Sequence, residues 1–274
     1  MKQNKIEHNT RGRTIALLTA GVVLAAAVSL AVCYSQLRSI WLEQCVIRDP
    51  AGQISVSEGK MVPADTLAES LGLKQGANLA LIDFEQKRKD VLKRIPNLRT
   101  LSVTRTMPDK VTVVTEERSP IAQLNVHGRK STSGKVVDAD GMVFIHQNGT
   151  RMLPVIREAQ APGTSCGSLL TGHALAALQM IEICRDPEFQ ELGVLEIDAS
   201  RPGYLLATLG DYSRAKIAWQ GMGEKSAAAK GNLRHQLSRL AKVIRSRVGE
   251  GSTVWNATDT SGTGYIYADR KGSL

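Results

Sequence analysis

The sequence predicts an α+β protein in which an N-terminal transmembrane helix precedes two small domains. Three observations predict this architecture. Residues 14–37 contain no charged side chain and are almost entirely apolar at their centre. Residues 45–118 show the periodicities of a β-α-α-β-β unit, and residues 119–274 those of a β-rich domain with one long amphipathic helix. The chain has 274 residues, 42% of them hydrophobic, which is enough to bury a core.

The apolar stretch at residues 14–37 is long enough to cross a bilayer, because a spanning helix needs about 20 such residues. A cleaved signal peptide, whose apolar region usually has about 7–15 residues, is the alternative. Four basic residues precede the stretch, against one acidic residue: Lys2, Lys5, Arg11, Arg13 and Glu7. Since basic flanks stay in the cytoplasm, we expect residues 1–13 to form a cytoplasmic tail and the remainder to lie outside, as in a single-pass type II protein.

The first domain begins with a strand and two helices. Ile54 and Val56 alternate with polar residues, as in a half-buried strand. Pro63 suits the first turn of a helix, and Leu67 and Leu71 lie on one face of it. The second helix is expected to start at Asp83, a capping residue, and its inward stripe and its terminating proline are Phe84, Val91, Leu92, Ile95 and Pro96.

A hairpin completes this domain. Leu101, Val103 and Arg105 alternate with small polar residues, and Val111 and Val113 continue the same period of two after a turn at residues 107–110. Proline and aspartate in that turn are typical turn residues.

The second domain is predicted to consist mostly of short strands. The strands are expected at residues 136–138, 142–145, 152–156, 194–197, 204–208, 216–219, 253–258 and 264–267. A tight turn at Asp140 and Gly141 joins the first two. Helices are expected at residues 174–185 and 226–248, the second with a leucine stripe at core-facing spacing.

Composition removes several classes of function. The net charge is +9, but no zinc-finger spacing or nucleic-acid-binding motif accompanies it, and we expect no nucleic acid partner. No C-x-x-C, nucleophile elbow or phosphate loop occurs, and the five histidines show no metal-ligand spacing. We therefore expect no catalytic residue, no cofactor, no metal and no small-molecule substrate. Cys33 lies in the apolar segment, Cys45 follows it, and Cys166 and Cys184 could pair.

The order of these signals resembles a known family. In the first domain the resemblance rests on a series of single residues and short motifs: Ile54, Val56, Gly59, Val62, Leu67, Leu71-Gly72-Leu73, Gly76-x-Asn78-Leu79, Asp83, Leu92, Ile95-Pro96, Val103-x-Arg105, Pro108 and Val111-x-Val113. These resemble a POTRA domain. Three later runs resemble the junction and the β domain of the FtsQ/DivIB family of bacterial cell-division proteins: Glu117-Arg118-x-Pro120-Ile121-Ala122, Val137-Asp138-x-Asp140-Gly141-x-Val143-Phe144 and Leu153-Pro154-x-Ile156.

The resemblance implies a non-catalytic scaffold of the divisome in the cytoplasmic (inner) membrane, at the division septum. It implies a POTRA domain over residues 45–118, a β domain over residues 119–274, and docking of coiled-coil proteins of the FtsB/FtsL type at the end of the β domain. Two alternatives remain. One is a POTRA-bearing factor of envelope assembly or secretion, and the other is an anchored periplasmic enzyme.

The last predicted strand is the first candidate for partner binding. It contains Gly264, Tyr265, Ile266 and Tyr267 and lies near the end of the chain, where a sheet edge can accept an incoming strand. A self-protected edge is the plainer interpretation of these residues.

The basic helix is the second candidate. Its seven basic residues have no acidic residue among them: Lys225, Lys230, Arg234, Arg239, Lys242, Arg245 and Arg247. They could form a solvated face or a surface for anionic lipid, an acidic polymer or an acidic partner, in which Arg245 and Arg247 are candidate contacts.

The junction at Glu117, Arg118 and Pro120 could be a binding elbow. More often such a segment only sets the angle between two domains, because proline restricts the residue before it to extended conformations.

Overall fold

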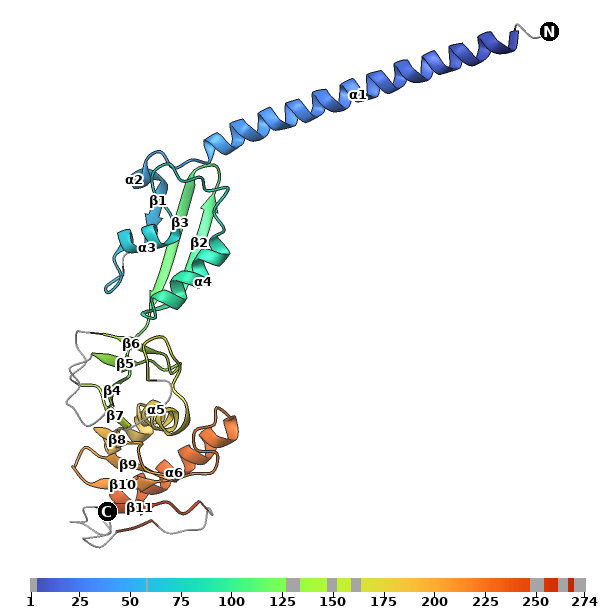
Figure 1. Cartoon of the computed structure of the whole chain (residues 1–274). Helices are drawn as coiled ribbons and strands as arrows, with labels where there is room; N and C mark the ends of the chain where they lie inside the picture. Colours follow the sequence, from blue (N-terminus) through green and yellow to red (C-terminus); the bar gives the residue numbers. More distant parts are fainter. Residues whose placement is uncertain are drawn as a thin grey trace. The chain divides into compact units, whose positions relative to one another are not determined.

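The computed structural model describes residues 4–57, 59–126, 134–146, 152–158, 164–246, 254–260 and 266–268. Helices and strands are mixed, so the predicted α+β class is confirmed (Figure 1). Contacts divide the chain into two compact units. The first comprises residues 1–58, 62–89 and 101–114, and the second comprises residues 59–61, 90–100 and 115–274.

The helix α1 (Asn4–Gln44) contains the apolar stretch. Its segment Ala20–Gln44 is, among the described residues, the one helix long and apolar enough to cross a membrane, and its large apolar side chains are exposed. The helix begins before residue 14 and continues past residue 37, because neither flank contains a proline that would end it.

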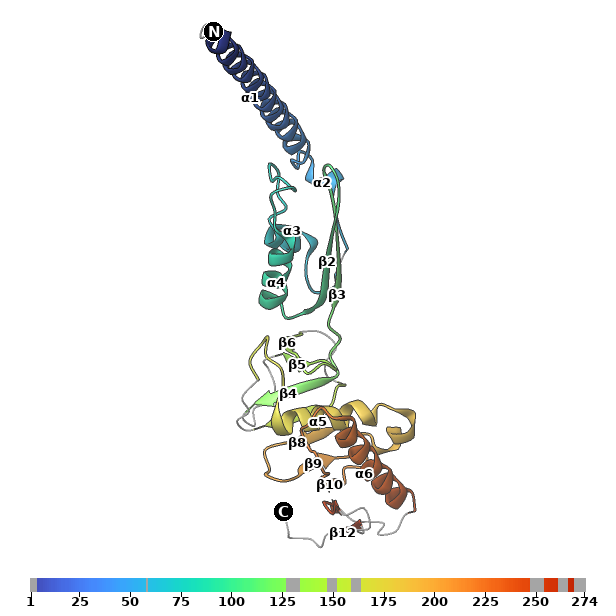
Figure 2. The same ribbon diagram turned by 90° about the vertical axis from the view of Figure 1, so that its right-hand side faces the viewer.

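A three-stranded sheet follows, with the strand order β1-β3-β2. Its elements are α2 (Pro50–Gln53), β1 (Ile54–Val56), α3 (Ala64–Leu71), α4 (Phe84–Arg94), β2 (Leu98–Thr106) and β3 (Lys110–Glu117). The strand β1 runs parallel to β3, with Ile54 opposite Val111. The helices α3 and α4 cover one face of this sheet (Figure 2).

The helices α3 and α4 lie where the sequence predicts them. Pro63 is the residue before α3, and Gly72 ends that helix with a φ of +77°, which glycine adopts without strain. The Asp83 carboxylate accepts the backbone N–H of Gln86 and so caps α4. Leu67 and Leu71 are fully buried, as predicted.

The second sheet has nine strands in the order β12-β11-β10-β9-β8-β7-β4-β5-β6. The strands are β4 (Ala122–Val126), β5 (Lys135–Val137), β6 (Val143–Ile145), β7 (Val155–Glu158), β8 (Glu196–Asp198), β9 (Leu205–Thr208), β10 (Arg214–Ile217), β11 (Val254–Ala257) and β12 (Tyr267–Ala268). The helices α5 (Gly172–Cys184) and α6 (Ala227–Arg245) and the short 3-10 helix η1 (Pro187–Leu192) share one apolar core with this sheet.

Several boundaries in this sheet differ from the prediction. The strands β7 and β8 begin three and two residues later than expected, and β10 begins two residues earlier, at Arg214. The reason for β10 is local: the Asp211 carboxylate bonds the N–H and hydroxyl of Ser213, which completes the turn just before the strand. The strand β4 and the helix η1 were not predicted.

Candidate partner-binding surfaces

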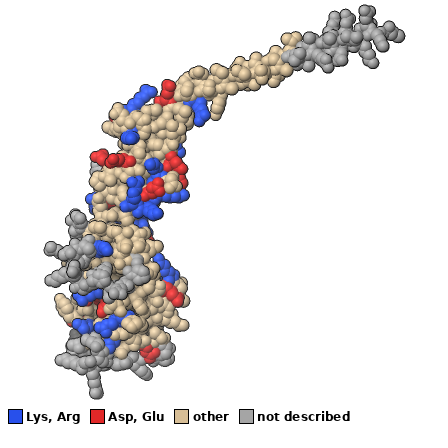
Figure 3. Space-filling view, in the orientation of Figure 1, with Lys and Arg blue, Asp and Glu red and all other residues tan. Residues whose placement is uncertain are grey.

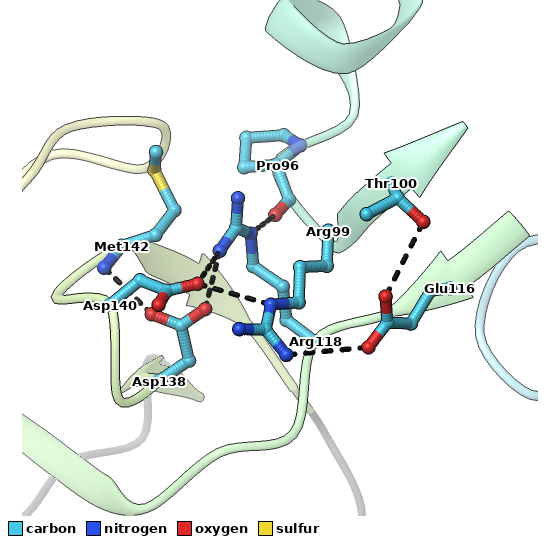
Figure 4. A network of polar contacts seen from close by, with 8 residues as sticks. All are labelled: Pro96, Arg99, Thr100, Glu116, Arg118, Asp138, Asp140 and Met142. Atoms are coloured by element: carbon cyan, nitrogen blue, oxygen red, sulfur yellow. Dashed lines mark hydrogen bonds and ion pairs between the residues drawn. The ribbon is translucent and has the colours of Figure 1, made fainter. Parts of the chain in front are cut away.

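The junction residue Arg118 lies at the centre of a charged network in the second unit (Figure 4). Its guanidinium donates to the carbonyl of Pro96 at 3.1 Å and to the carboxylates of Asp138 at 2.5 Å and Asp140 at 3.3 Å. The side chains of Arg118 and Asp138 are only 12% and 6% exposed. Such a buried, multiply bonded ion pair fixes the position of the backbone that carries it.

Asp138 and Asp140 belong to the turn between β5 and β6. The second oxygen of Asp138 accepts the N–H of Met142 at 2.8 Å, and Gly141 has a φ of +88°. The carboxylates of this predicted turn thus also accept hydrogen bonds from Arg118. No sequence signal predicts the contact between Arg118 and Asp138, because the two residues lie 20 positions apart and each is explained by its local role.

Arg99 extends the network at the surface. Its guanidinium pairs with Asp140 at 3.2 Å and Glu116 at 3.3 Å, and the Thr100 hydroxyl donates to Glu116. The nearby carboxylates, Asp140 first, raise the pKa of Arg99. Arg99 is half exposed, so these contacts are weaker than those of Arg118.

Glu117 and Pro120 complete the junction. The Glu117 carboxylate accepts the backbone N–H groups of Lys60 and Met61 at 3.0 and 2.8 Å. Pro120 is half-buried in the short segment between β3 and β4. Since Glu117 and Arg118 are occupied by internal partners, the geometry favours a structural role for the junction over a binding elbow.

The last strand, β12, lies at one end of the nine-stranded sheet. It pairs with β11 in antiparallel fashion, with Asn256 opposite Tyr267 and Trp255 opposite Ala268. Ile266 is half-buried against the core. Among the described residues no further strand covers the outer side of β12, while Gly264 and Tyr265 lie outside the described residues.

The basic helix α6 pairs with acidic residues of the same unit. Lys230 meets Glu182 of α5 at 3.3 Å, and Arg234 contacts Asp186 and Glu188 at the start of η1. Arg234 also lies over the ring of Phe189, 5.7 Å from its centre. Figure 3 shows basic and acidic side chains next to each other elsewhere on the surface too, most clearly over α4.

Arg245 forms a two-point contact with Glu191. The hydrogen bond and the charge of Arg245 lower the pKa of Glu191, and the carboxylate in turn raises the pKa of Arg245. Arg245 is therefore less available to a partner than its sequence suggests, and Arg247 lies outside the described residues.

The cysteines are unpaired in the structure, so Cys166 and Cys184 do not form the disulfide that their sequence allowed. Burial raises the pKa of Cys184 to about 12. Among the described residues, no group of three or more His, Cys, Asp or Glu side chains is arranged to hold a metal ion.

A parallel-paired strand, two helices over one face of the small sheet and a hairpin are the order expected of a POTRA domain. Residues 50–118 match the family described as the POTRA domain, FtsQ-type. These residues form an FtsQ-type POTRA domain. Together with the N-terminal apolar helix, the domain makes the chain FtsQ/DivIB-like, as its motifs indicate. No curated protein matches the chain significantly.

Proposed function

We propose that this FtsQ/DivIB-like chain is a non-catalytic scaffold of the bacterial division machinery, anchored in the cytoplasmic membrane by α1. The FtsQ-type POTRA domain directly after an apolar N-terminal helix is the observation that carries the proposal. POTRA domains are typically protein-interaction domains, and the FtsQ type favours division over envelope assembly or secretion. Residues 1–13 face the cytoplasm, and the POTRA and β domains act outside it, at the septum.

Within this role the β domain recruits coiled-coil proteins of the FtsB/FtsL type through β12. The position of β12 at the end of the sheet order supports this, since an edge strand can pair with one more strand through its main chain. The POTRA domain serves to recruit the chain to the division site.

Localisation and depletion test the division role. A fluorescent protein is fused to the N-terminus, dividing cells are imaged, and the untagged protein is depleted in parallel. A midcell band, with elongated or enlarged undivided cells on depletion, is expected. An even peripheral signal with normal division would overturn the proposal.

Two proline variants test β12 within the same strain. In a strand, successive N–H groups point to opposite sides, so one of Tyr267→Pro and Ala268→Pro removes an N–H that faces β11 and the other removes an N–H that faces outward. We expect the outward variant to melt like the wild type and to localise normally, but to lose co-purification of FtsB/FtsL-type proteins and to fail in rescuing division. The variant that removes the N–H facing β11 is recognised by its lower melting temperature. The matched control is Tyr267→Ala, which keeps the backbone N–H. Full rescue by both proline variants would exclude strand addition at β12.

A further inference from the structure

The C-terminal end of α1 is fixed to the loop between α3 and α4, within the first unit. The Asn78 side-chain amide donates to the carbonyl of Leu42 at 2.8 Å, and the N–H of Leu79 donates to the carbonyl of Cys45 at 2.9 Å. A β-bridge joins Val46 to the same Asn78. These contacts hold the loop beside the last turn of α1.

The length of α1 gives the height of this contact when the helix spans a membrane. Leu42 follows the end of the charge-free stretch, Leu37, by five residues, which is about 7.5 Å along the helix axis. The headgroup layer on each side of the hydrocarbon core is about 5–8 Å thick. Trp41 is 45% exposed, and tryptophan is enriched at that level. The loop at Asn78 therefore lies at the level of the lipid headgroups.

An exposed leucine lies next to this contact. The side-chain oxygen of Asn78 accepts the N–H of Ala80 at 2.9 Å, and its backbone carbonyl accepts the N–H of Leu81 at 3.1 Å, which makes a tight turn. The Leu81 side chain is 71% exposed. A leucine on a fixed turn can bury its side chain in a bilayer without reordering the loop.

A second exposed apolar side chain belongs to the turn between β2 and β3. This turn lies at the same end of the domain as the loop between α3 and α4 (Figure 2). The Arg105 guanidinium, just before the turn, donates to the carbonyl of Leu79 at 2.9 Å and so links the two. Met107, in the turn, is 46% exposed. Leu81 and Met107 thus place apolar surface at one end of the POTRA domain.

The charges at this end balance. Each of the segments 38–49, 74–83 and 107–110 contains as many basic as acidic residues. The basic residues are Arg38, Arg48, Lys74 and Lys110, and the acidic residues are Glu43, Asp49, Asp83 and Asp109. This end therefore offers little net attraction to anionic lipid, and what it offers a membrane is its apolar side chains.

We propose that Leu81 and Met107 insert into the headgroup layer of the leaflet from which α1 emerges. The POTRA domain then rests on the bilayer through its own surface as well as through its anchor. The helix fixes where the domain is held, and the two additional contacts fix how it is turned. The inference rests on the proposed anchoring by α1 but not on the proposed role in division.

Fluorescent labels on single cysteines test this contact in the full chain. Cys33→Ala and Cys166→Ser remove the exposed thiols. In the folded chain Cys45 is buried, and the raised pKa of Cys184 keeps its thiol protonated, so both stay unlabelled. Each introduced cysteine is labelled with bimane in detergent, and the chain is then reconstituted in phosphatidylcholine nanodiscs. Quenching by a spin label on the lipid headgroup is compared with quenching by iodide in the water.

We expect the headgroup spin label to quench labels at Leu81→Cys and Met107→Cys about threefold or more above a label at Val114→Cys, with the reverse order for iodide. Val114 is the matched control, because it is 53% exposed in the same sheet but about 13 Å along β3 from the start of that strand. Anionic phosphatidylglycerol in the nanodiscs should leave the quenching unchanged, because the charges balance.

A second set of variants shows whether the two side chains act together. Leu81→Gln should reduce headgroup quenching of the Met107→Cys label by about twofold or more, since the domain loses one of its two contacts. Val114→Gln, which replaces a comparably exposed apolar side chain, should leave that quenching unchanged. Melting temperatures check that the variants are folded, and if Leu81→Gln melts lower, the comparison of labels decides.

A label at Leu24→Cys, within α1, separates this inference from the proposed anchoring. If a spin label on the lipid acyl chain does not quench it, the anchoring fails and the inference with it. If it is quenched, equal headgroup quenching at Leu81, Met107 and Val114 would overturn the inference alone. Quenching that requires anionic lipid, or an equal effect of Val114→Gln and Leu81→Gln, would overturn it too.

Discussion

At the scale of single residues, Arg118 determines how residues 115–118 are held. Its guanidinium has three acceptors in the second unit, and one of them, Asp138, is nearly inaccessible to water. Removal of the cation leaves a buried carboxylate without its charge partner, which is far more costly than the loss of an exposed pair.

We expect Arg118→Ala to lower the free energy of unfolding of the second unit by about 3 kcal/mol. Arg99→Ala, which removes the exposed arginine from the same network, should cost less than about 1 kcal/mol. Urea unfolding of the full chain in a Trp41→Phe background measures both, because the remaining tryptophans, Trp219 and Trp255, lie in the second unit. Equal costs for the two variants would show that burial of Asp138 does not matter.

The cysteines give a second prediction at this scale. The pKa of Cys184 is raised to about 12 by burial and by the nearby charge of Asp186, so its thiol stays protonated near neutral pH. Cys166 is exposed. At pH 8 we expect a maleimide to modify Cys166 in the folded chain and Cys184 only after denaturation, as followed by mass spectrometry of peptides. Similar rates at both residues in the folded chain would contradict the burial of Cys184.

At the scale of elements, α6 is held to its neighbours by ion pairs as well as by its leucine stripe. The pair at its end gives a pH dependence with a defined sign. The pKa of Glu191 is lowered from its ordinary value of 4.5, so the carboxylate stabilises the fold above pH 4.5 and this contribution is lost as the pH falls below that value.

We therefore expect Glu191→Gln to melt slightly below the wild type at pH 7, by about 2 °C or less, since the pair is exposed. The difference should vanish as the pH is lowered through the range below 4.5, where the wild-type carboxylate becomes protonated. Thermal unfolding followed by circular dichroism at a series of pH values measures it. A difference that grows on acidification would show that Arg245 does not stabilise the charged form of Glu191.

The sequence predicted elements whose ends carry local signals. Gly72 and Asp83 mark helix ends by their own chemistry, and the turn at Asp140 and Gly141 identifies the β5–β6 hairpin. No local signal predicts the strand β4, because its partners β5 and β7 lie further along the chain and its pairing with β7 is parallel. Parallel partners have no connecting turn that a local pattern could reveal.

The candidate sites were less predictable than the fold. The sequence showed a run of basic residues on α6, but the acidic residues that pair with them lie on α5, on η1 and just before η1. The edge position of β12 was predicted from its place in the chain and agrees with the sheet order. The cavity that the β5–β6 turn, α5 and the start of α6 line together had no sequence signal, because only the fold brings these three elements together.

At the scale of the whole molecule, orientation in the membrane is the property that the proposed function needs most. The basic residues before α1 predict that the N-terminus is cytoplasmic. The exposed Cys166 offers a direct test of this prediction.

We expect a membrane-impermeant maleimide to label a variant that retains Cys166 alone in intact cells, after permeabilisation of any outer membrane. A matched variant with Lys2→Cys as its single cysteine should be labelled only after lysis. The opposite pattern would reverse the orientation and remove the proposed partners.

The network around Arg118 also decides where the protein can be divided for study. The POTRA match ends at residue 118, which makes the next peptide bond the natural place to cut. A fragment that stops there keeps Arg118 and Arg99 but loses Asp138 and Asp140, while the complementary fragment keeps both acids without either arginine. Each piece then exposes charges that the intact chain neutralises. Electrostatic binding by either fragment would therefore reflect the cut as much as the protein.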